Sequence, residues 1–560
     1  MSNENSNIQT ETVETTPVQT NTIPKPTPLL KVATTGRDLL FAMLFLVAGI
    51  IWIDFSLYGG FDLGYTIASV ILGALVLIYP TAEHRLSLFG TLYATCGVAI
   101  TVPFCMYTSA SSKILLFFWS VLLMGLAIVN NTKIASRGWM QLTEALRLIV
   151  ATPFERCSNT LASLFQDKGS ASKKRIKGIL IGVACGLPAL FVIVPILCSS
   201  DAAFEAVINS IFADGISRVI ASVIWGTLLA ISLFTSVFAA NKKIVKIDSP
   251  SQAEKSDKPK ESKVGGVAST PVTAFLTTIG VVYVVYLFSQ LTYFFDAFSG
   301  FLPENYTPAQ YARRGFFEMA VICAINIVVI AVSLLICKKD KKGNQPLSVR
   351  LLCGFICLFS LVIVATVIGK LVMYMGFYGL TEMRLYTSLF SVCAAIIIIF
   401  VGIRLFAPRF AYFRAAVATL AVLSVGIAFA DVNTTIARYN TEAYLNGYLQ
   451  QVDVNYLGRL NSASVPSLVK LMDCDDEDVA RKAATKLYYL ADGYGWVDKS
   501  DYGSSSNNGI YGQNEATGNY KFKPTKADDF REYNIQYVKA RDLIDKNWDK
   551  ILDLCGSAIY

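Results

Sequence analysis

Eleven long apolar stretches alternate with short polar segments between Arg37 and Asp431. Most are about twenty residues long, the length that lets an α-helix cross a hydrocarbon core roughly 30 Å thick. The pattern predicts an all-α fold, a polytopic membrane bundle of about 11 spans with a small C-terminal soluble helical domain. The predicted spans are residues 38–57, 61–80, 86–108, 113–131, 176–200, 216–241, 273–295, 315–337, 349–375, 384–406 and 412–432.

Lysine and arginine fall almost entirely into every second gap between these stretches. The N-terminal tail and the gaps on its side of the membrane hold 28 basic residues, whereas the five gaps on the other side hold 5. Because cytoplasmic loops retain Lys and Arg, we expect the N-terminus in the cytoplasm. An odd number of spans then places the C-terminal domain outside the cytoplasm, on a multi-pass protein of the cell membrane.

The same pattern divides the chain into five segments. Two of them are polar and poor in apolar clusters, which is typical of solvated chain. The segments are 1–36, a disordered cytoplasmic tail; 37–241, a first membrane half of six spans; 242–266, a charged cytoplasmic linker; 267–432, a second membrane half of five spans; and 433–560, an extracytoplasmic helical domain.

One inner loop of the first half, residues 130–177, is long and basic. Apolar residues such as Leu142, Leu146 and Ile149 recur in it at helical spacing, beside Arg147. Such a helix either lies in the inner membrane interface or packs on the bundle as a short soluble helix. The sequence leaves both alternatives open.

The charge balance points to a lipid surface. Only 16% of the residues are charged and the mean hydropathy is +0.48. The net charge of +8 belongs to the cytoplasmic loops, since residues 433–560 carry 15 basic and 18 acidic side chains. We expect contact with the lipid bilayer, with anionic lipids at the cytoplasmic face, and no nucleic-acid partner.

Residues for familiar catalytic chemistry are scarce. The single histidine, His84, lies in a short inner loop, which excludes a Ser-His-Asp triad on the outer side and any His-rich metal site. Most of the 12 cysteines are scattered through apolar spans, although Cys474 and Cys555 in the external domain are candidates for a disulfide. No catalytic residue, metal ligand, nucleotide-binding motif or cofactor is predicted.

The span at 176–200 combines small residues with prolines. Glycines four residues apart allow a neighbouring helix to approach closely, and prolines free backbone carbonyls inside the membrane. The segment is either a tightly packed helix or a broken helix that lines a transport path. The residues concerned are Gly178, Gly182, Gly186, Pro188 and Pro195.

Ionisable residues concentrate at the outer ends of the second half. Lys370 lies within an apolar run, where a charge is costly and normally has a partner. It either extends outward to water or pairs with Glu318, Glu382 or Asp431. The predicted ligand or ion-pair cluster consists of Arg313, Arg314, Glu318, Lys370, Glu382, Arg384 and Asp431.

Several of these residues belong to short motifs. Residues 311–318 read YARRGFFE, 378–384 read YGLTEMR, 186–188 read GLP, 200–204 read SDAAF, and Asp431 leads into IARYN at 436–440. Together they resemble uncharacterised bacterial membrane proteins grouped as domain of unknown function 4173 and the related 4153 group. The resemblance covers about residues 150–470 and implies a multi-span membrane protein without an assigned activity, cofactor or ligand.

The C-terminal segment has the pattern of short amphipathic helices. Pro466 falls in the first turn of one helix, and the acidic run 473–478 caps the next, which together resemble one HEAT-type pair. A final helix at 534–555, with Ile544 and Trp548 on its apolar face, is expected to pack back on that pair. The aromatic-containing stretch 493–520 predicts a flexible loop able to meet sugars or peptide.

Three classes of function fit this organisation. An envelope scaffold or sensor, whose external domain meets an envelope protein or a cell-wall ligand, fits the fused domain and the lack of catalytic residues. A secondary transporter fits the number of spans and Lys370. A membrane enzyme acting on lipid-linked substrates is the least favoured, with Arg313, Arg314 and Glu318 as its candidate residues.

Overall fold

The computed structural model describes most of the membrane helices and the C-terminal domain. The described residues are 32–58, 60–81, 86–132, 134, 138, 140–164, 193, 196–201, 216–242, 267–299, 307–339, 344–498, 521–522 and 530–556. The predicted N-terminal tail up to residue 31, most of the linker 242–266 and the predicted loop from residue 499 to 520 lie outside this part of the chain.

Ten helices in the described part are long and apolar enough to cross a membrane, so the all-α membrane fold is confirmed. The eleventh predicted span, 176–200, falls mostly outside the described residues, as do Gly178, Gly182, Gly186, Pro188 and Pro195. The ten are α1 (Gly36–Tyr58), α2 (Leu63–Thr81), α3 (Leu88–Ala99) continued by the 3-10 helix η1 (Val102–Cys105), α4 (Ala110–Asn131), α8 (Ile216–Asn241), α9 (Ser269–Ser299), α10 (Pro308–Ile336), α11 (Leu347–Tyr378), α12 (Glu382–Phe406) and α13 (Tyr412–Phe429).

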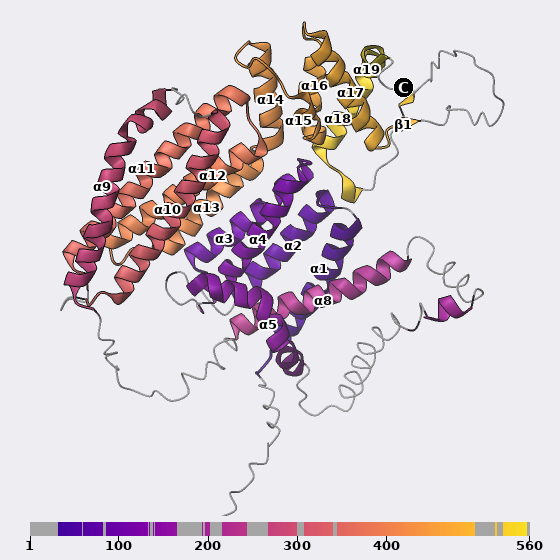
Figure 1. Ribbon diagram of the computed structural model, residues 1–560. Coiled ribbons are helices and arrows are strands. Elements are labelled where there is room, and N and C mark those ends of the chain that lie inside the picture. Colours follow the sequence, from indigo (N-terminus) through magenta and orange to yellow (C-terminus); the bar gives the residue numbers. More distant parts are fainter. Residues whose placement is uncertain are drawn as a thin grey trace, which may run out of the picture.

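The first group of helices packs α1 against α8, with α2, α3 and α4 alongside (Figure 1). At the crossing of α1 and α8, a Cβ on Gly49 would lie 2.7 Å from the carbonyl oxygen of Gly226. Only glycine permits so close a contact, which is the usual means of bringing membrane helices together. Large buried aromatics, among them Phe45, Tyr79 and Phe238, fill the space between these helices.

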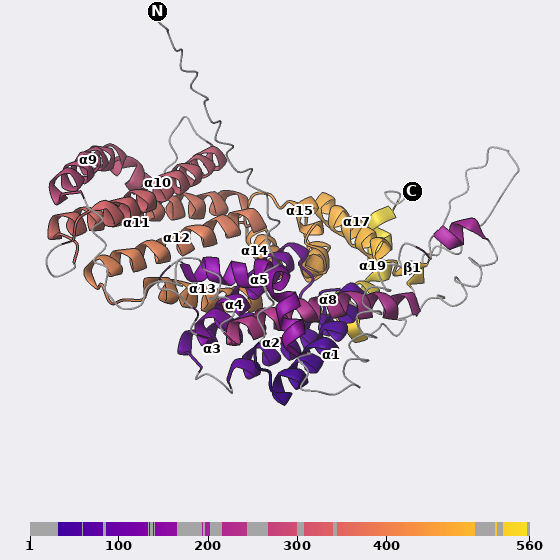
Figure 2. The ribbon, with the colours of Figure 1, turned by 90° about the horizontal axis from the view of Figure 1, so that it is seen from below.

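The second group places α11 at its centre, in contact with α9, α10 and α12. α11 is apolar around its circumference and contributes Cys353, Cys357 and Phe359 to the buried core of this group, where both cysteines are free thiols. α13 contacts α12 of this group and α3 and α4 of the first group. Figure 2 shows α13 between the two groups, while α9 lies at the far edge.

The basic inner loop contains helix α5 (Met140–Leu164), which packs against α4 and α8. Its buried face is largely polar and includes Gln141 and Arg156. The opposite face exposes Leu146, Val150 and Phe154, the last with 86% of its surface accessible. The helix therefore packs on the bundle and also presents an apolar stripe, so it combines features of both predicted alternatives.

The C-terminal domain gathers at one end of the bundle (Figure 1). Its buried core joins residues from the first and last of its helices, including Ile436, Leu468, Leu487 and Ile551. The domain contains α14 (Val432–Leu445), α15 (Val454–Gly458), the 3-10 helix η3 (Asn461–Ser464), α16 (Val465–Leu471), α17 (Glu477–Gly493), the two-residue strands β1 (Val497–Asp498) and β2 (Lys521–Phe522), the 3-10 helix η4 (Phe530–Glu532), α18 (Ile535–Lys546) and α19 (Trp548–Cys555).

Local sequence explains where these helices begin and end. Asp476 accepts hydrogen bonds from the backbone N–H groups of Asp478 and Val479 and so caps α17, as expected for the acidic run. The predicted helix 534–555 is two helices, because the chain breaks at Asn547 and α19 turns to pack on α17. Cys474 and Cys555 are both free thiols, so the candidate disulfide is absent from this structure.

Candidate functional site at the domain end of the bundle

The seven residues predicted as a cluster fall at three places near the end of the bundle that carries the C-terminal domain. Arg313, Arg314, Glu318 and Lys370 lie on α10 and α11. Glu382 and Arg384 lie at the start of α12, and Asp431 lies between α13 and α14. No ion pair within the described residues joins one of these places to another.

The first place is built around Lys370, whose side chain is 8% exposed. Its Nζ lies 4.1 Å from the centre of the Tyr311 ring, a cation–π contact. A Cβ on Gly315 would lie 3.1 Å from Cδ of Lys370, so this glycine makes room for the lysine stem. Arg314, and not Lys370, holds Glu318 in a salt bridge of 2.8 Å, while Lys370 interacts with that carboxylate at longer range.

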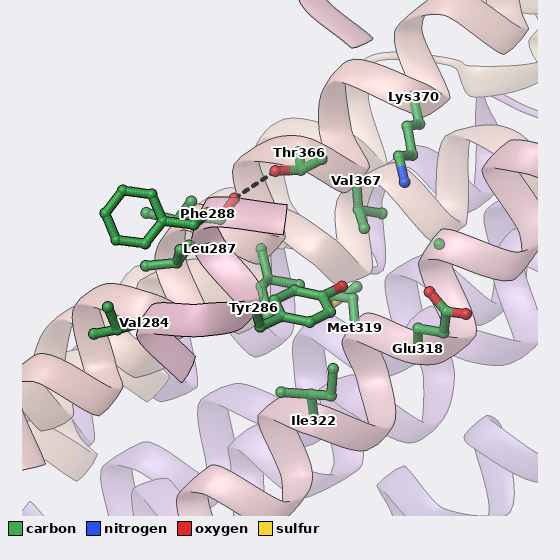
Figure 3. A pocket seen from close by; sticks show the side chains of 13 residues that line it. Val284, Tyr286, Leu287, Phe288, Glu318, Met319, Ile322, Thr366, Val367 and Lys370 are labelled. Atoms are coloured by element: carbon green, nitrogen blue, oxygen red, sulfur yellow. Dashed lines mark hydrogen bonds between the residues drawn. The ribbon is translucent and has the colours of Figure 1, made fainter. Parts of the chain in front are cut away.

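A cavity of about 400 Å³ lies between α9, α10 and α11 beside these residues. Figure 3 shows the ammonium of Lys370 and the carboxylate of Glu318 directed toward each other from two walls, with the Tyr286 ring between α9 and the other helices. The remaining walls are mostly aliphatic, and Phe288 at the edge is 71% exposed. Lys370 therefore does not extend outward to water; it is retained inside the helix group.

The second place is the turn between α11 and α12. Arg384 donates hydrogen bonds to the carbonyl oxygens of Tyr378 (2.9 Å) and Gly379 (2.6 Å) and stacks on the Tyr374 ring. These bonds satisfy carbonyl groups that the end of α11 leaves without helical partners. Arg384 is therefore fixed by backbone groups of its own turn.

Two motifs singled out in the sequence meet at this turn. The side chain of Asn440 on α14 accepts a hydrogen bond from the backbone N–H of Leu380 (2.7 Å) and donates one to the Leu380 carbonyl (2.9 Å). Gly379 has φ +73°, and a Cβ there would lie 2.5 Å from Oδ1 of Asn440. Glycine is thus required at 379 by its backbone angle and by the closeness of α14.

A cleft of about 1290 Å³ adjoins the same turn, between the end of α11 and the segment 448–456 of the C-terminal domain. Its lining combines aromatic rings with amide and charged groups. Tyr448 is 82% exposed, and the hydroxyl of Tyr456 accepts a hydrogen bond from the backbone N–H of Glu382. Besides aliphatic side chains, the lining contains the polar and aromatic residues Phe377, Tyr378, Thr381, Arg384, Asn440, Tyr448, Gln450, Gln451, Asp453 and Tyr456.

The third place is Asp431, which caps α14 by accepting a hydrogen bond from the backbone N–H of Thr434. Its φ of +43° is a left-handed conformation that non-glycine residues seldom adopt. The amide of Gln536 on α18 donates a further bond of 2.9 Å to its carboxylate. Burial raises the pKa of Asp431 above its ordinary value, and the bonds from Thr434 and Gln536 offset part of that rise.

A fourth set of charged residues was not predicted, and it joins the C-terminal domain to the bundle. Asp54 on α1 receives two hydrogen bonds of 2.8 Å from Arg218 on α8 and a third of 2.8 Å from Arg531 on η4. Asp62, after α1, pairs with Lys113 and accepts a bond from the side chain of Asn534. One carboxylate shared by two arginines is a strong, charge-assisted contact.

Sequence reasoning overlooked this set although one signal was present. Asp54 is an acidic residue near the end of an apolar span, where such residues are rare. Its partners lie 164 and 477 residues away along the chain, so only the fold brings them together. Among the described residues, no group of His, Cys, Asp and Glu side chains is arranged to hold a metal ion.

Comparison with known proteins supports the resemblance found in the motifs. Residues 93–471 match the family model described as Domain of unknown function (DUF4153), the 4153 group that the motifs indicated beside the 4173 group. No curated protein and no solved structure matched the chain. Since the matched segment covers more than half of a chain with ten candidate spans, this integral membrane protein belongs to the DUF4153 family.

Proposed function

We propose that the protein is a sensor or scaffold of the cell envelope, whose C-terminal helical domain lies outside the cytoplasm and meets an envelope protein or a cell-wall ligand. The observation that carries this proposal is the way the domain is attached. Arg531 and Asn534 fix one edge of it to the ends of α1 and α2, whereas the cleft beside Tyr448 stays open at another edge.

The chemistry of that cleft suits a polar, mostly uncharged ligand. Gln450 and Gln451 offer amide donors and acceptors, and the tyrosines offer flat faces on which sugar rings or peptide side chains pack. Its one Arg and one Asp balance in charge. A glycan or peptide segment of the cell wall has the required chemistry.

The two motifs that meet at the turn provide a route from this cleft to the membrane. Asn440 holds Leu380 at the start of α12, and Tyr456 holds the backbone of Glu382. A ligand that moved the segment 448–456 would therefore pull on the first turn of α12 directly. Such a contact is the physical link that a sensor requires.

A photo-crosslinking residue in place of Tyr448, in intact cells, tests the proposal. We expect an adduct with a wall glycan or an envelope protein that is missing when the same residue replaces Tyr489, a 54% exposed tyrosine on α17 away from this cleft. Equal adducts at both positions, or no adduct at Tyr448, would contradict the proposed function. Adducts only with cytoplasmic proteins would contradict it as well. The last result would also overturn the orientation inferred from the charges.

A secondary transporter is the second candidate, and Lys370 is the observation that favours it. Ionisable residues within membrane spans often mark ion or substrate paths. A transporter of this kind would depend on Lys370 and Glu318 and would leave the Tyr448 position without a specific adduct.

A further inference from the structure

A second cavity, of about 750 Å³, lies at the opposite end of the bundle from the C-terminal domain. It forms where α12 ends and α13 begins, against Gly138 and the first turn of α5. Of the described residues that line it, three are arginines and none is acidic. The lining consists of Gly138, Gln141, Arg404, Pro408, Arg409, Phe410, Ala411, Tyr412, Phe413 and Arg414.

The arginines retain unused hydrogen-bonding capacity. Nε of Arg414 is buried and has no hydrogen-bond partner among the described residues. The hydrogen bond found for Arg404 reaches the Phe410 carbonyl at 3.5 Å, at the limit of such a contact. Arg409 is exposed and faces the same cavity. A buried N–H group without an acceptor is costly, so an acceptor supplied to Nε of Arg414 from outside the chain would be stabilising.

The start of α13 adds to the positive potential. Its N-cap residue, Ala411, makes no side-chain capping bond, so the first N–H groups of this 18-residue helix gain no partner from that side chain. The positive end of the helix dipole lies at the same place, and Tyr412 lines the cavity with its hydroxyl group. Helix N-termini of this kind bind phosphate well, especially when arginines stand beside them.

The general retention of basic residues in cytoplasmic loops explains why arginines occur on this side. It does not explain why three of them surround one cavity without a carboxylate. Lys338 and Lys339, at the end of α10 on the same side, are exposed and line no such cavity. The two lysines therefore provide a matched comparison for the effect of charge alone.

We propose that this cavity binds a phosphate-bearing anion, held by Arg404, Arg409, Arg414 and the N-terminus of α13. A volume of 750 Å³ exceeds the needs of a single phosphate and is within the usual range of small-molecule sites. Two sources supply this chemistry: the headgroup of an anionic phospholipid in the adjacent leaflet, and a soluble phosphorylated compound. The proposal is independent of the ligand of the C-terminal domain.

Binding to the full chain in nanodiscs tests the proposal. One arm titrates inorganic phosphate onto protein in purely zwitterionic nanodiscs by calorimetry. The other arm counts phosphatidylglycerol molecules retained by protein from mixed nanodiscs in native mass spectrometry. Binding in the first arm indicates a soluble source, and retention in the second arm alone indicates a lipid headgroup.

In whichever arm binds, the double variant Arg409→Gln/Arg414→Gln is expected to weaken binding about tenfold or more, since each lost guanidinium removes charged hydrogen bonds. Lys338→Gln/Lys339→Gln removes the same charge and should change binding less than about twofold. Arg404→Lys keeps the charge but loses the fork geometry, and an intermediate loss is expected. An equal loss in the lysine variant, or no binding in either arm, overturns the proposal.

Discussion

The surroundings of Lys370 suit its charge poorly. Within the described part of the chain its ammonium has a cation–π contact with Tyr311 and distant electrostatic contacts with Glu318 and Arg314, but no hydrogen bond. Removing an ammonium group from water costs several kcal/mol, and a cation–π contact returns about 2 kcal/mol at most. Stability alone therefore does not account for a lysine at this position.

Replacing Lys370 by Met, which has a similar length and no charge, should leave the protein as stable as the wild type or more stable by up to about 2 kcal/mol. Thermal unfolding in detergent measures the change. Lys470→Met is the control, because Lys470 is 58% exposed in its pair with Glu442 and should change stability by less than about 0.5 kcal/mol. A loss above about 1 kcal/mol in Lys370→Met would show that Lys370 anchors α10 structurally.

At the scale of elements, Asp431 is the residue that joins α13 to α14. It combines an unfavourable backbone conformation with a buried carboxyl group. Asp431 adopts φ +43° and is bonded to Thr434 and Gln536. The bond to Gln536 connects the start of α14 to α18. Asp431 therefore fixes the orientation of α14, the first helix of the C-terminal domain, relative to α18.

The raised pKa of Asp431 gives this junction a pH dependence. The folded protein holds the proton more tightly than the unfolded chain, so the stabilising contribution is complete below the ordinary carboxyl pKa of about 4 and is lost as the pH rises through the raised value. Asp431→Asn should remove this loss, since Asn also caps helices and tolerates the left-handed conformation. We expect the variant to gain stability over the wild type between pH 4 and pH 7, measured by thermal unfolding. A difference that stays constant over this range would contradict the assignment.

The elements predicted from the sequence agree with the structure where the signal is local. Hydrophobic length identified the spans, and Pro466 and Asp476 marked helix starts in the C-terminal domain. Some boundaries were missed: α10 begins at Pro308 and not near residue 315, because Thr307 and Gln310 form a capping box there. Arg313 and Arg314 therefore lie in the second turn of the helix, on the same helix as Glu318.

The candidate site was less predictable because it depends on which helices meet. Glu318 and Arg314 are one turn apart on the same helix and form a pair of 2.8 Å, as this spacing predicts, so the carboxylate that was also offered as a partner for Lys370 is already paired. Arg384 donates its hydrogen bonds to backbone carbonyl groups, and the pattern of charged residues cannot predict such bonds. The three arginines around the cavity between α12 and α13 likewise had the pattern of ordinary loop charges, and only the fold brings them together.

At the scale of the whole molecule, helices distant in sequence are joined at the end that carries the domain. Asp54, Arg218 and Arg531 connect α1, α8 and η4, while α13 packs between the two groups of membrane helices and leads directly into α14. The side chains of Asp54, Arg218 and Arg531 are 23%, 22% and 18% exposed, so water screens their attraction only in part. These contacts make the domain a continuation of the bundle.

Two variants measure how much the ion pairs of Asp54 contribute to the stability of the protein. They differ in which of these pairs they remove. Arg531→Gln removes the bond between the domain and Asp54 but leaves the Arg218 pair, whereas Asp54→Asn weakens both. An arginine–carboxylate pair of this exposure is worth roughly 1.5 kcal/mol, so we expect a loss of about 1.5 kcal/mol in thermal unfolding for Arg531→Gln, which removes one pair, and of about 3 kcal/mol for Asp54→Asn, which weakens two. Arg481→Gln, at a pair 58% and 52% exposed, should cost less than about 0.5 kcal/mol.

Hydrogen exchange locates the effect within the molecule. In Arg531→Gln the backbone amides of α18 should exchange faster while those of α3 and α4 keep their wild-type rates, because only the docking of the domain is weakened. If α18 exchanges as in the wild type and Arg531→Gln is no less stable than Arg481→Gln, the ion pair does not hold the domain. The domain would then depend on the hydrogen bonds of Asn534 to the bundle and on the apolar packing of η4 on α1 and α2, where Phe530 meets the Phe55 ring at 5.8 Å.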